Sequence, residues 1–293
     1  MTAQIPQYPA SRPINISDRE LLTGFFREIQ PSVSELSFAN IFLFREIHQY
    51  RLTTVKGSLV ILGCGYDSQP YVLPPLCGDR SEAARYMLSQ GNTLYGADQR
   101  FITEHLSEEG CTIVADRDND DYLYLKSNLA DLPGKLYHKK KNRINYFSLR
   151  NSYTVEPYSK RHQHSSLGLL HGWEMAHSQY LSRSMTAEVG ATREGVERAD
   201  ELGLEGVVVL TERGVSAFAL GERLNTNTFV CHFEKSDPFL EGLAQLVNRE
   251  FCRSLTGEYI YVNREQDLGE SGLKAAKSSY HPIDMVRKYR VNK

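Results

Sequence analysis

One order of helices and strands occurs twice in this chain, and it constrains the fold more than any single motif. The first occurrence begins with an amphipathic helix whose apolar stripe runs from Leu21 to Ile29, and we expect Ser17 and Glu20 to form a capping box at its start. A second helix through Phe38 and Ile47 follows. The remaining elements predicted for this half are strands at 50–55, 58–62 and 70–76, a helix from Asp79 to Gln90, a strand at 93–96, a helix at 99–106 and a strand at 111–115.

The same order returns after Thr192, with one leading helix instead of two. The predicted elements are a helix at about 193–202, strands at 206–210, 215–220 and 228–233, a helix opening at Asp237, a strand at 258–262, a helix at 271–278 and a strand at 283–290. Asp237 as N-cap and Pro238 as first helical residue are typical of a helix start. The sequence therefore predicts an α/β (α+β) protein with two modules, each a mixed sheet flanked by helices.

We expect an N-terminal module over residues 1–115, a connector with a basic helix over residues 116–191 that packs with the second module, and a C-terminal module over residues 192–293. Lys+Arg 34 and Asp+Glu 36 leave a net charge of −2, so nucleic acid would have to be bound by a local patch. The apolar runs have strand length and no signal peptide is recognised, which predicts a cytoplasmic protein without an integral membrane segment.

The connector carries a dense cluster of cationic and amide side chains. After a turn at Pro133-Gly134, a predicted helix would bury Leu136, Tyr137, Ile144 and Phe147 on one side. Like charges on adjacent turns repel, so a bound anion such as phosphate would stabilise the cluster. The alternative is a solvated face that covers the joint between domains. The candidate residues for binding donor phosphates are Lys135, Lys139, Lys140, Asn142 and Arg143.

A second cluster of charged residues lies near the end of the chain, where a loop with Gly269 and Gly272 follows a predicted strand. Carboxylates at a strand end that face two lysines one helical turn apart could hold an amine, deprotonate it, or pair structurally. We expect these side chains to converge on a pocket; an ion-paired helix cap is the alternative. The candidate catalytic residues are Glu265, Asp267, Lys274, Lys277 and Tyr280. The histidines at 162, 164, 171 and 177 lack zinc-ligand spacing, so no metal is expected.

Two segments together resemble a known family. They are Asn263-Arg-Glu-Gln-Asp-Leu-Gly269 with 272–282, and Leu132-Pro-Gly-Lys135 with 140–145. This pattern is similar to that of proteins related to the C-terminal domain of phosphatidylglycerol lysyltransferase, and the element order resembles the GNAT acyltransferase superfamily. The resemblance implies a tandem GNAT-like fold and, in the lipid enzymes, transfer of an aminoacyl group from tRNA to lipid. The residues that match the pattern are Glu265, Asp267, Gly269, Lys277, Tyr280 and Pro282.

The sequence departs from this family at one of the matched positions and in its extent. Lys274 stands where the pattern has Arg, which keeps the charge but loses the bidentate fork. The 293 residues hold no counterpart of the membrane-spanning half of the lipid enzymes, so a lipid acceptor does not follow from the resemblance.

We therefore expect a GNAT-type acyltransferase or aminoacyltransferase that acts on an amine or hydroxyl of a small molecule or peptide. Its donor substrate would be aminoacyl-tRNA or acyl-CoA, with no tightly bound cofactor. One alternative is an acyl-CoA-dependent N-acetyltransferase, although the loops at 77–82 and 234–239 lack the glycine-rich pattern that offers backbone amides to a pyrophosphate. The other is a non-catalytic tandem fold that binds RNA or a nucleotide through 135–143. The sequence leaves the oligomeric state open.

Overall fold

A computed structural model describes residues 4–106 and 110–293 and divides the chain into two compact units. Unit 1 comprises the chain up to Asp121, Gln266–Gly269 and Met285–Lys293, and unit 2 comprises Tyr122–Glu265 and Glu270–Asp284. Each unit holds a mixed sheet flanked by helices, which confirms the predicted α/β class. Most of the range 116–191, predicted as a connector that packs with the second module, belongs to unit 2, whereas Met285–Lys293, from the range predicted as the C-terminal module, belong to unit 1.

The sheet of unit 1 has seven strands, of which one comes from the far end of the chain. β4 and β5 are parallel, and β14 runs antiparallel to both β5 and β6, between which it lies. The remaining neighbours are antiparallel. In spatial order the strands are β1 (Arg12–Pro13), β2 (Arg51–Val55), β3 (Ser58–Cys64), β4 (Pro70–Val72), β5 (Thr93–Asp98), β14 (Lys288–Asn292) and β6 (Thr112–Ala115).

The helices of unit 1 are α1 (Arg19–Ile29), α2 (Phe38–Leu43), α3 (Arg80–Ser89) and α4 (Gln99–His105), with short 3-10 helices at Ile16–Asp18 and Arg117–Asn119. The predicted capping box at Ser17 is wrong. Asn15 and Asp18 form the box instead, because the chain makes a 3-10 turn before α1, and Asp18 caps the backbone N–H of Asn15 at 2.9 Å. α3 and α4 bury Ala84, Met87 and Phe101 in one apolar cluster with the strands.

The sheet of unit 2 also has seven strands among the described residues. β9, β10 and β11 are antiparallel, β11 and β12 are parallel, and β7 runs antiparallel to β12. In spatial order the strands are β13 (Asp284–Val286), β7 (Asp121–Leu125), β12 (Tyr261–Asn263), β11 (Thr228–Ser236), β10 (Gly214–Arg223), β9 (Glu205–Thr211) and β8 (Thr154–Pro157).

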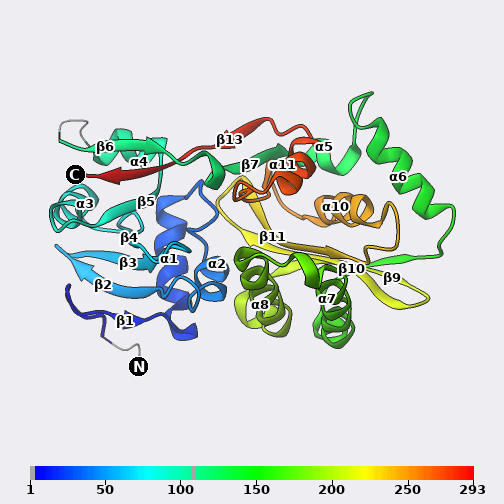
Figure 1. Cartoon of the computed structure of the whole chain (residues 1–293), viewed down its shortest axis with the longest axis horizontal. Helices are drawn as coiled ribbons and strands as arrows, with labels where there is room; N and C mark the ends of the chain where they lie inside the picture. The colour runs from blue at the N-terminus through cyan, green and yellow to red at the C-terminus, as the bar shows by residue number, and fades with distance from the viewer. Residues whose placement is uncertain (1–3, 107–109) are drawn as a thin grey trace. The chain divides into compact units, whose positions relative to one another are not determined.

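Helices cover both faces of this second sheet. In Figure 1, α10 lies on one side of β10 and β11, while α7 and α8 lie on the other. The helices are α5 (Lys126–Asp131), α6 (His138–Ser148), α7 (Gln163–His177), α8 (Arg183–Glu197), α9 (Ala199–Leu202), α10 (Leu243–Ser254) and α11 (Ser271–Ser278), with 3-10 helices at Lys160–His162 and Ser178–Tyr180.

The start of α10 differs from the prediction. The expected helix start at Asp237 is wrong, because the Asp237 carboxylate accepts the backbone N–H of Phe239 in a turn, and the helix begins six residues later at Leu243. Gly242 precedes it with a φ of 92°, a left-handed value that favours glycine. A Cβ at Gly242 would lie 2.0 Å from the carbonyl oxygen of Arg143, so glycine also permits close packing against α6.

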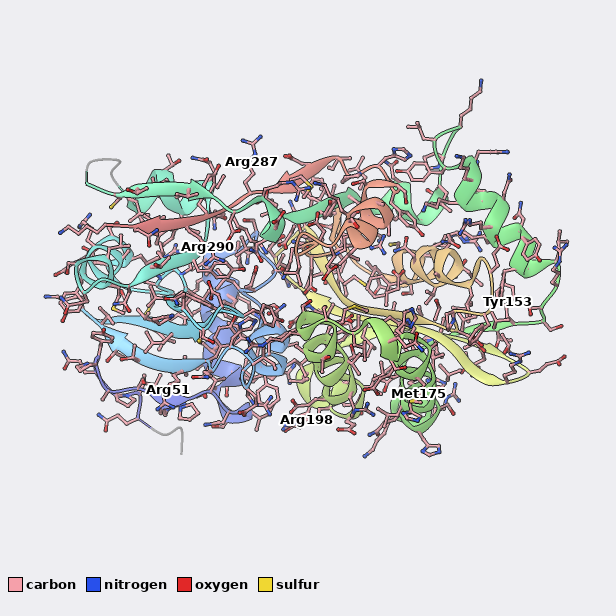
Figure 2. All side chains as sticks on the ribbon, in the orientation of Figure 1. Arg51, Tyr153, Met175, Arg198, Arg287 and Arg290 are labelled. Atoms are coloured by element: carbon pink, nitrogen blue, oxygen red, sulfur yellow. The ribbon has the colours of Figure 1, made fainter. Side chains whose placement is uncertain are left out.

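The two sheets repeat one strand order, and in both a strand from elsewhere in the chain completes it. Three antiparallel strands are followed by a parallel neighbour, and then by an antiparallel strand, which is β14 in unit 1 and β7 in unit 2. Inside unit 1, β14 is fixed by Lys288, whose buried Nζ lies 2.6 Å from both Asp121 and Glu35. Arg290, labelled in Figure 2, donates from Nε to Asp116 at 2.7 Å.

Candidate active site

In unit 2, the two parallel strands pair over a short stretch and then part. β11 and β12 pair only from Thr228 to Val230, after which β12 ends at Asn263 while β11 continues to Ser236. In open α/β sheets, ligands bind outside the carboxyl ends of parallel strands, where the connections diverge. The side chains of Arg264 and Glu265 lie just past this point and reach back to β11. This edge of the sheet is therefore the first place in unit 2 to look for a site.

A buried histidine joins two carboxylates at this edge. His232 on β11 contacts Glu265 through Nδ1 at 2.7 Å and Glu222 on β10 through Nε2 at 3.0 Å, and only 1% of its side chain is exposed. Burial alone would lower the pKa of His232, but the hydrogen bonds to Glu222 and Glu265 raise it to about 10. The imidazole is thus a cation at neutral pH, held between two acceptors.

The backbone of the same loop is held in an unusual conformation. Glu265 has a φ of 56° and Leu268 a φ of 53°, both in the left-handed region that non-glycine residues seldom occupy. The side chain of buried Asn263 accepts the backbone N–H of Glu265 at 2.8 Å, which helps to hold this geometry. Such conformations cost about 1–3 kcal/mol each and gather at functional sites.

Beside the histidine, Arg264 forms the centre of a cluster of aromatic and charged side chains. Its Nη2 donates to Glu234 at 3.2 Å, and its guanidinium lies 4.8 Å from the ring centre of Tyr280 and 5.7 Å from that of Tyr124. Burial would lower the pKa of Arg264, but the charge of Glu234 raises it further above its ordinary value. Within the described residues, Nη1 of Arg264 is buried and makes no hydrogen bond.

The two clusters predicted from the sequence meet here. Lys140 on α6 donates to the hydroxyl of Ser279 at 2.6 Å, and its Nζ lies 4.0 Å from the ring centre of Tyr280. Tyr137, just before α6, donates to the carbonyl oxygen of Tyr280 at 3.0 Å. The start of α6 is thereby tied to the turn after α11, although more than 130 residues separate Lys140 from Ser279 in sequence.

The other residues predicted to bind phosphate face solvent. Lys135, Lys139, Asn142 and Arg143 are exposed, whereas Lys140 is half-buried. Tyr137, Ile144 and Phe147 are buried as predicted. The prediction for Leu136 is wrong: its side chain is 69% exposed, because the turn at Lys135–Tyr137 precedes α6 and turns it outward.

The candidate catalytic residues are divided between the two units. Glu265, Lys274, Lys277 and Tyr280 belong to unit 2, and Asp267 belongs to unit 1, where it is buried with Arg117 at 3.4 Å. Lys277 donates to the carbonyl oxygen of Arg264 at 2.6 Å. Lys274 is exposed on α11. The side chains of Glu265, Lys277 and Tyr280 therefore all lie around the segment at 264–265, and the catalytic roles stay predictions.

Chemically, this edge of unit 2 combines acceptors and cations that acyl transfer can use. The Glu222–His232–Glu265 group carries a net negative charge and could orient an ammonium or accept a hydrogen bond from a hydroxyl. The orphaned Nη1 of Arg264 and the Lys140 ammonium are suited to an oxyanion or phosphate oxygen.

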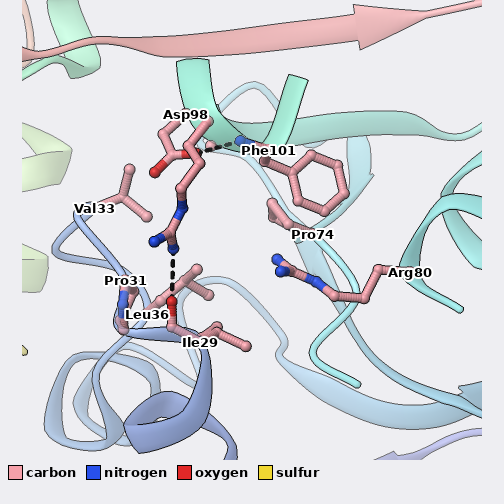
Figure 3. A pocket seen from close by; sticks show the side chains of 10 residues that line it. Ile29, Pro31, Val33, Leu36, Pro74, Arg80, Asp98 and Phe101 are labelled. Atoms are coloured by element: carbon pink, nitrogen blue, oxygen red, sulfur yellow. Dashed lines mark hydrogen bonds between the residues drawn. The ribbon is translucent and has the colours of Figure 1, made fainter. Parts of the chain in front are cut away.

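A small pocket lies in unit 1, where β4 and β5 part (Figure 3). Pro74, Asp98 and Phe101 are among its lining residues, and Arg80 reaches over the ring of Phe101 at 4.9 Å. Arg100 donates to the carbonyl oxygen of Ile29 at 2.6 Å and so caps the end of α1. None of the residues predicted to be catalytic or phosphate-binding lines this pocket.

Sequence reasoning missed His232 and the role of Arg264. His232 lies in a run of buried residues along β11 and has no metal-ligand spacing, so nothing local distinguishes it. The available signal was a histidine between apolar residues in a strand, because a buried imidazole needs hydrogen-bond partners. Arg264 was part of the recognised motif, but its partner Glu234 lies 30 residues away.

The described segments 4–106 and 110–293 contain no helix with the length and apolar character needed to cross a membrane. One curated protein, tRNA uridine(34) hydroxylase from Paraburkholderia phytofirmans, is 29% identical over 86 residues, which is 29% of the length of each chain. This local match covers too little of either protein to indicate a shared fold.

Solved structures resemble the whole chain. A conserved protein of unknown function from Bacteroides thetaiotaomicron is 28% identical, with a TM-score of 0.87 over 98% of this chain and 99% of that one. L-PGS from Bacillus licheniformis is 13% identical, with a TM-score of 0.63 over 99% and 94%. FemX is 9% identical, with a TM-score of 0.55 over 96% of both chains. The last two likenesses show a shared fold.

The family evidence agrees with the motifs described above. The profile described as phosphatidylglycerol lysyltransferase, C-terminal, matches residues 26–292, which is nearly all of both units. The matched region includes α6, the loop after β12 and the turn after α11, from which Lys140 and Arg264 both contact the ring of Tyr280. The chain therefore belongs to the family of the phosphatidylglycerol lysyltransferase C-terminal domain.

Proposed function

We propose that this protein is a transferase that moves an acyl or aminoacyl group onto an amine or hydroxyl, with aminoacyl-tRNA as its donor. The observation that carries the proposal is the contact of Lys140 with Ser279 and Tyr280, which joins a basic helix to the end of the sheet where two parallel strands part. Family membership supports transfer as the reaction class.

The basic helix supports a donor that carries phosphates. From Leu132 to Val155 the sequence has six Lys and Arg residues and no Asp or Glu. Lys135, Lys139 and Arg143 are exposed, and the guanidinium of Arg150 lies 3.7 Å from the ring centre of Tyr146, whose side chain is 43% exposed. A basic surface with interleaved aromatic rings suits a nucleic-acid strand, whose phosphates need cations and whose bases stack.

The acceptor would lie against the carboxylates of the same edge. In this proposal, Glu265 accepts a hydrogen bond from the acceptor amine or hydroxyl, and the contact with His232 orients the Glu265 carboxylate. Lys277 holds the backbone of Arg264 in place, and Tyr280 forms the wall between Arg264 and Lys140. Asp267 would act by fixing the loop that carries Glu265, and Lys274 by attracting the donor.

The proposal is tested by following labelled acyl groups. The full chain is incubated with tRNA charged with radiolabelled amino acids, or with labelled acetyl-CoA. The acceptors offered are vesicles containing phosphatidylglycerol, a peptide with a free amine, and small amines. We expect label to leave the tRNA and appear in one acceptor, at a rate that Glu265→Gln lowers by about 10²-fold, the usual size of a lost acid–base contribution.

Lys160→Gln, an exposed change in the same unit, is the matched control and should leave the rate unchanged. If label is transferred from acetyl-CoA but not from tRNA, the donor is acyl-CoA and the proposed tRNA donor is wrong. Binding of tRNA with no transfer to any acceptor would instead favour a non-catalytic RNA-binding fold, and the proposed reaction would be rejected.

A further inference from the structure

The small pocket of unit 1 has two arginines among its lining residues. Arg80 begins α3 and Arg100 lies in the first turn of α4, so they come from the helices that follow β4 and β5. Figure 3 shows the Arg80 guanidinium pointing from α3 toward the other lining residues. Most of these are apolar, and Val33, Leu36 and Phe101 are buried. The pocket therefore combines two cations with apolar walls.

Both guanidiniums have N–H groups left to donate. Arg80 donates from Nε to the carbonyl oxygen of Pro75 at 2.7 Å. Arg100 donates from Nη2 to the carbonyl oxygens of Ile29 at 2.6 Å and Gln30 at 3.3 Å. Within residues 4–106 and 110–293 these are the hydrogen bonds of the two side chains, and no carboxylate forms an ion pair with either. A guanidinium has five N–H donors, so most of these donors are available to a ligand.

The charges around the pocket favour an anion. Asp98 is the acidic residue of the lining, but one of its oxygens caps the start of α4 at 2.8 Å and the other accepts the hydroxyl of Ser32 at 2.5 Å. The pKa of Arg80 is lowered, first by burial and then by the charge of Arg100, and the charges of Asp98 and Glu104 do not offset this. A bound anion would relieve the repulsion between the two arginines.

The backbone beside the pocket has few amide groups to offer to such an anion. Pro74 and Pro75 have no N–H. The N–H groups of Leu73 and Leu76 donate at 2.9 Å to carbonyl oxygens of β3. The arginine side chains would therefore have to hold the anion, and their planar forks match the geometry of phosphate oxygens.

We propose that this pocket of unit 1 binds a single phosphate group, either free or at the end of a small monoester, through Arg80 and Arg100. The cavity volume is about 10 Å³, which is room for about one water-sized group. One phosphate oxygen enters it, and the rest of the ligand lies at the mouth. Phosphate carries about −1.5 to −2 charges at pH 7, so it matches two arginines better than a carboxylate does. This site does not depend on the transfer proposed for unit 2.

The test measures phosphate binding to the full chain by titration calorimetry at low ionic strength. The probes are inorganic phosphate, methyl phosphate and acetate. We expect saturable binding of a phosphate probe, and the tighter of the two phosphates identifies the source. Arg80→Gln and Arg100→Gln should each weaken it by about tenfold or more, because charge-assisted hydrogen bonds are lost. Arg85→Gln, an exposed change on α3, removes the same charge and should leave the affinity unchanged.

Two further variants separate the pocket from surface charge. Ile29→Phe keeps both arginines but fills the cavity, so it should abolish saturable binding. Arg80→Lys keeps the charge but loses the fork, so its affinity should be intermediate. Urea unfolding checks that each variant is folded, and these two variants decide if Arg100→Gln, which also loses the cap on α1, is not. Phosphate binding that survives Ile29→Phe or both Gln variants, or acetate binding as tight as that of phosphate, would overturn the proposal.

Discussion

A charged histidine among apolar neighbours is stable only while its partners hold it. At His232, β11 and β12 are no longer joined by backbone hydrogen bonds. The side chain of His232 makes the connection instead, through its contacts with Glu222 and Glu265. Breaking a buried ion pair by removing one partner typically costs about 3–5 kcal/mol, since the remaining charge is left uncompensated. The local stability of this edge therefore depends on one side chain.

We predict that His232→Gln lowers the free energy of unfolding by about 3 kcal/mol at pH 7. The pKa of His232 is about 10 in the folded protein and about 6.5 when unfolded, so its contribution is complete below pH 6.5 and is lost as the pH rises through 10. Urea unfolding at pH 7 and pH 10 should therefore show a smaller difference between wild type and variant at pH 10. An equal difference at both values would contradict the raised pKa.

Gly242 offers a second prediction at the scale of single residues. Gly242→Ala would place a Cβ 2.0 Å from the carbonyl oxygen of Arg143 and would strain a φ of 92°, whereas Gly134→Ala, at a φ of 69°, meets no atom within 4 Å. A left-handed backbone conformation costs an L-residue about 1–2 kcal/mol, and overpacking adds about 1–3 kcal/mol. Chemical denaturation should therefore show Gly242→Ala to be the more destabilising. Equal losses would mean that α6 moves away freely.

Residue types in a motif were predictable, but their partners were not. Lys140 and Tyr280 were named as candidate site residues because each lies in a recognisable sequence pattern. It gave no sign that the two touch, or that Glu265 faces His232, because such contacts depend on how β11, β12 and α6 are placed in three dimensions.

At the scale of elements, α6 is an exposed basic helix on a protein of nearly neutral charge. We predict that replacing Lys139, Lys140 and Arg143 together by Gln weakens tRNA binding and makes the slope of log K against log salt shallower by about 2 units, because fewer counterions are released. Binding measured between 50 and 200 mM salt, conditions typical of such titrations, checks this.

A matched triple variant controls for total charge. Lys160, Arg213 and Arg223 are exposed cations of unit 2 outside α6, and their replacement by Gln removes the same charge. Their loss should leave the salt slope close to that of the wild type. If both triple variants behave alike, α6 is a solvated surface and the protein binds polyanions by its overall field.

The local sequence pattern predicted some helices and strands correctly and others incorrectly. The helix predicted at 271–278 matches the bounds of α11. The helix expected from Asp237 starts only at Leu243, since a turn competed for the same Asp-Pro signal. The strand expected at 283–290 is divided between β13 and β14, which lie in different sheets. Strand patterns do not specify which sheet a strand joins.

At the scale of the whole molecule, the place of β14 in the first sheet depends on the buried charge of Lys288. Burial lowers the pKa of Lys288, but Asp121 and Glu35 raise it to about 12, so Lys288 is a cation throughout the physiological range. We predict that Lys288→Met lowers the stability of unit 1 by about 3–5 kcal/mol, because two buried carboxylates lose their counter-charge. Hydrogen exchange should quicken first in β5, β6 and β14.

A compensating variant distinguishes lost charge from lost packing. Adding Glu35→Gln and Asp121→Asn to Lys288→Met removes the uncompensated carboxylates and should recover part of the lost stability. No recovery would show that the lysine stem, rather than the ion pairs, holds β14. Slower exchange in β5 than in the wild type would contradict the fixing role itself.

The position of β14 also has a consequence for synthesis on the ribosome. Residues 288–292 are translated long after β5 and β6, yet they fill the place between those two strands. The first sheet must therefore wait with an unpaired edge while more than 170 residues emerge, a period in which such edges are exposed to aggregation. The N-terminal part of the nascent chain is therefore exposed to aggregation until β14 has been synthesised. A chaperone that shields this edge would raise the yield of folded protein.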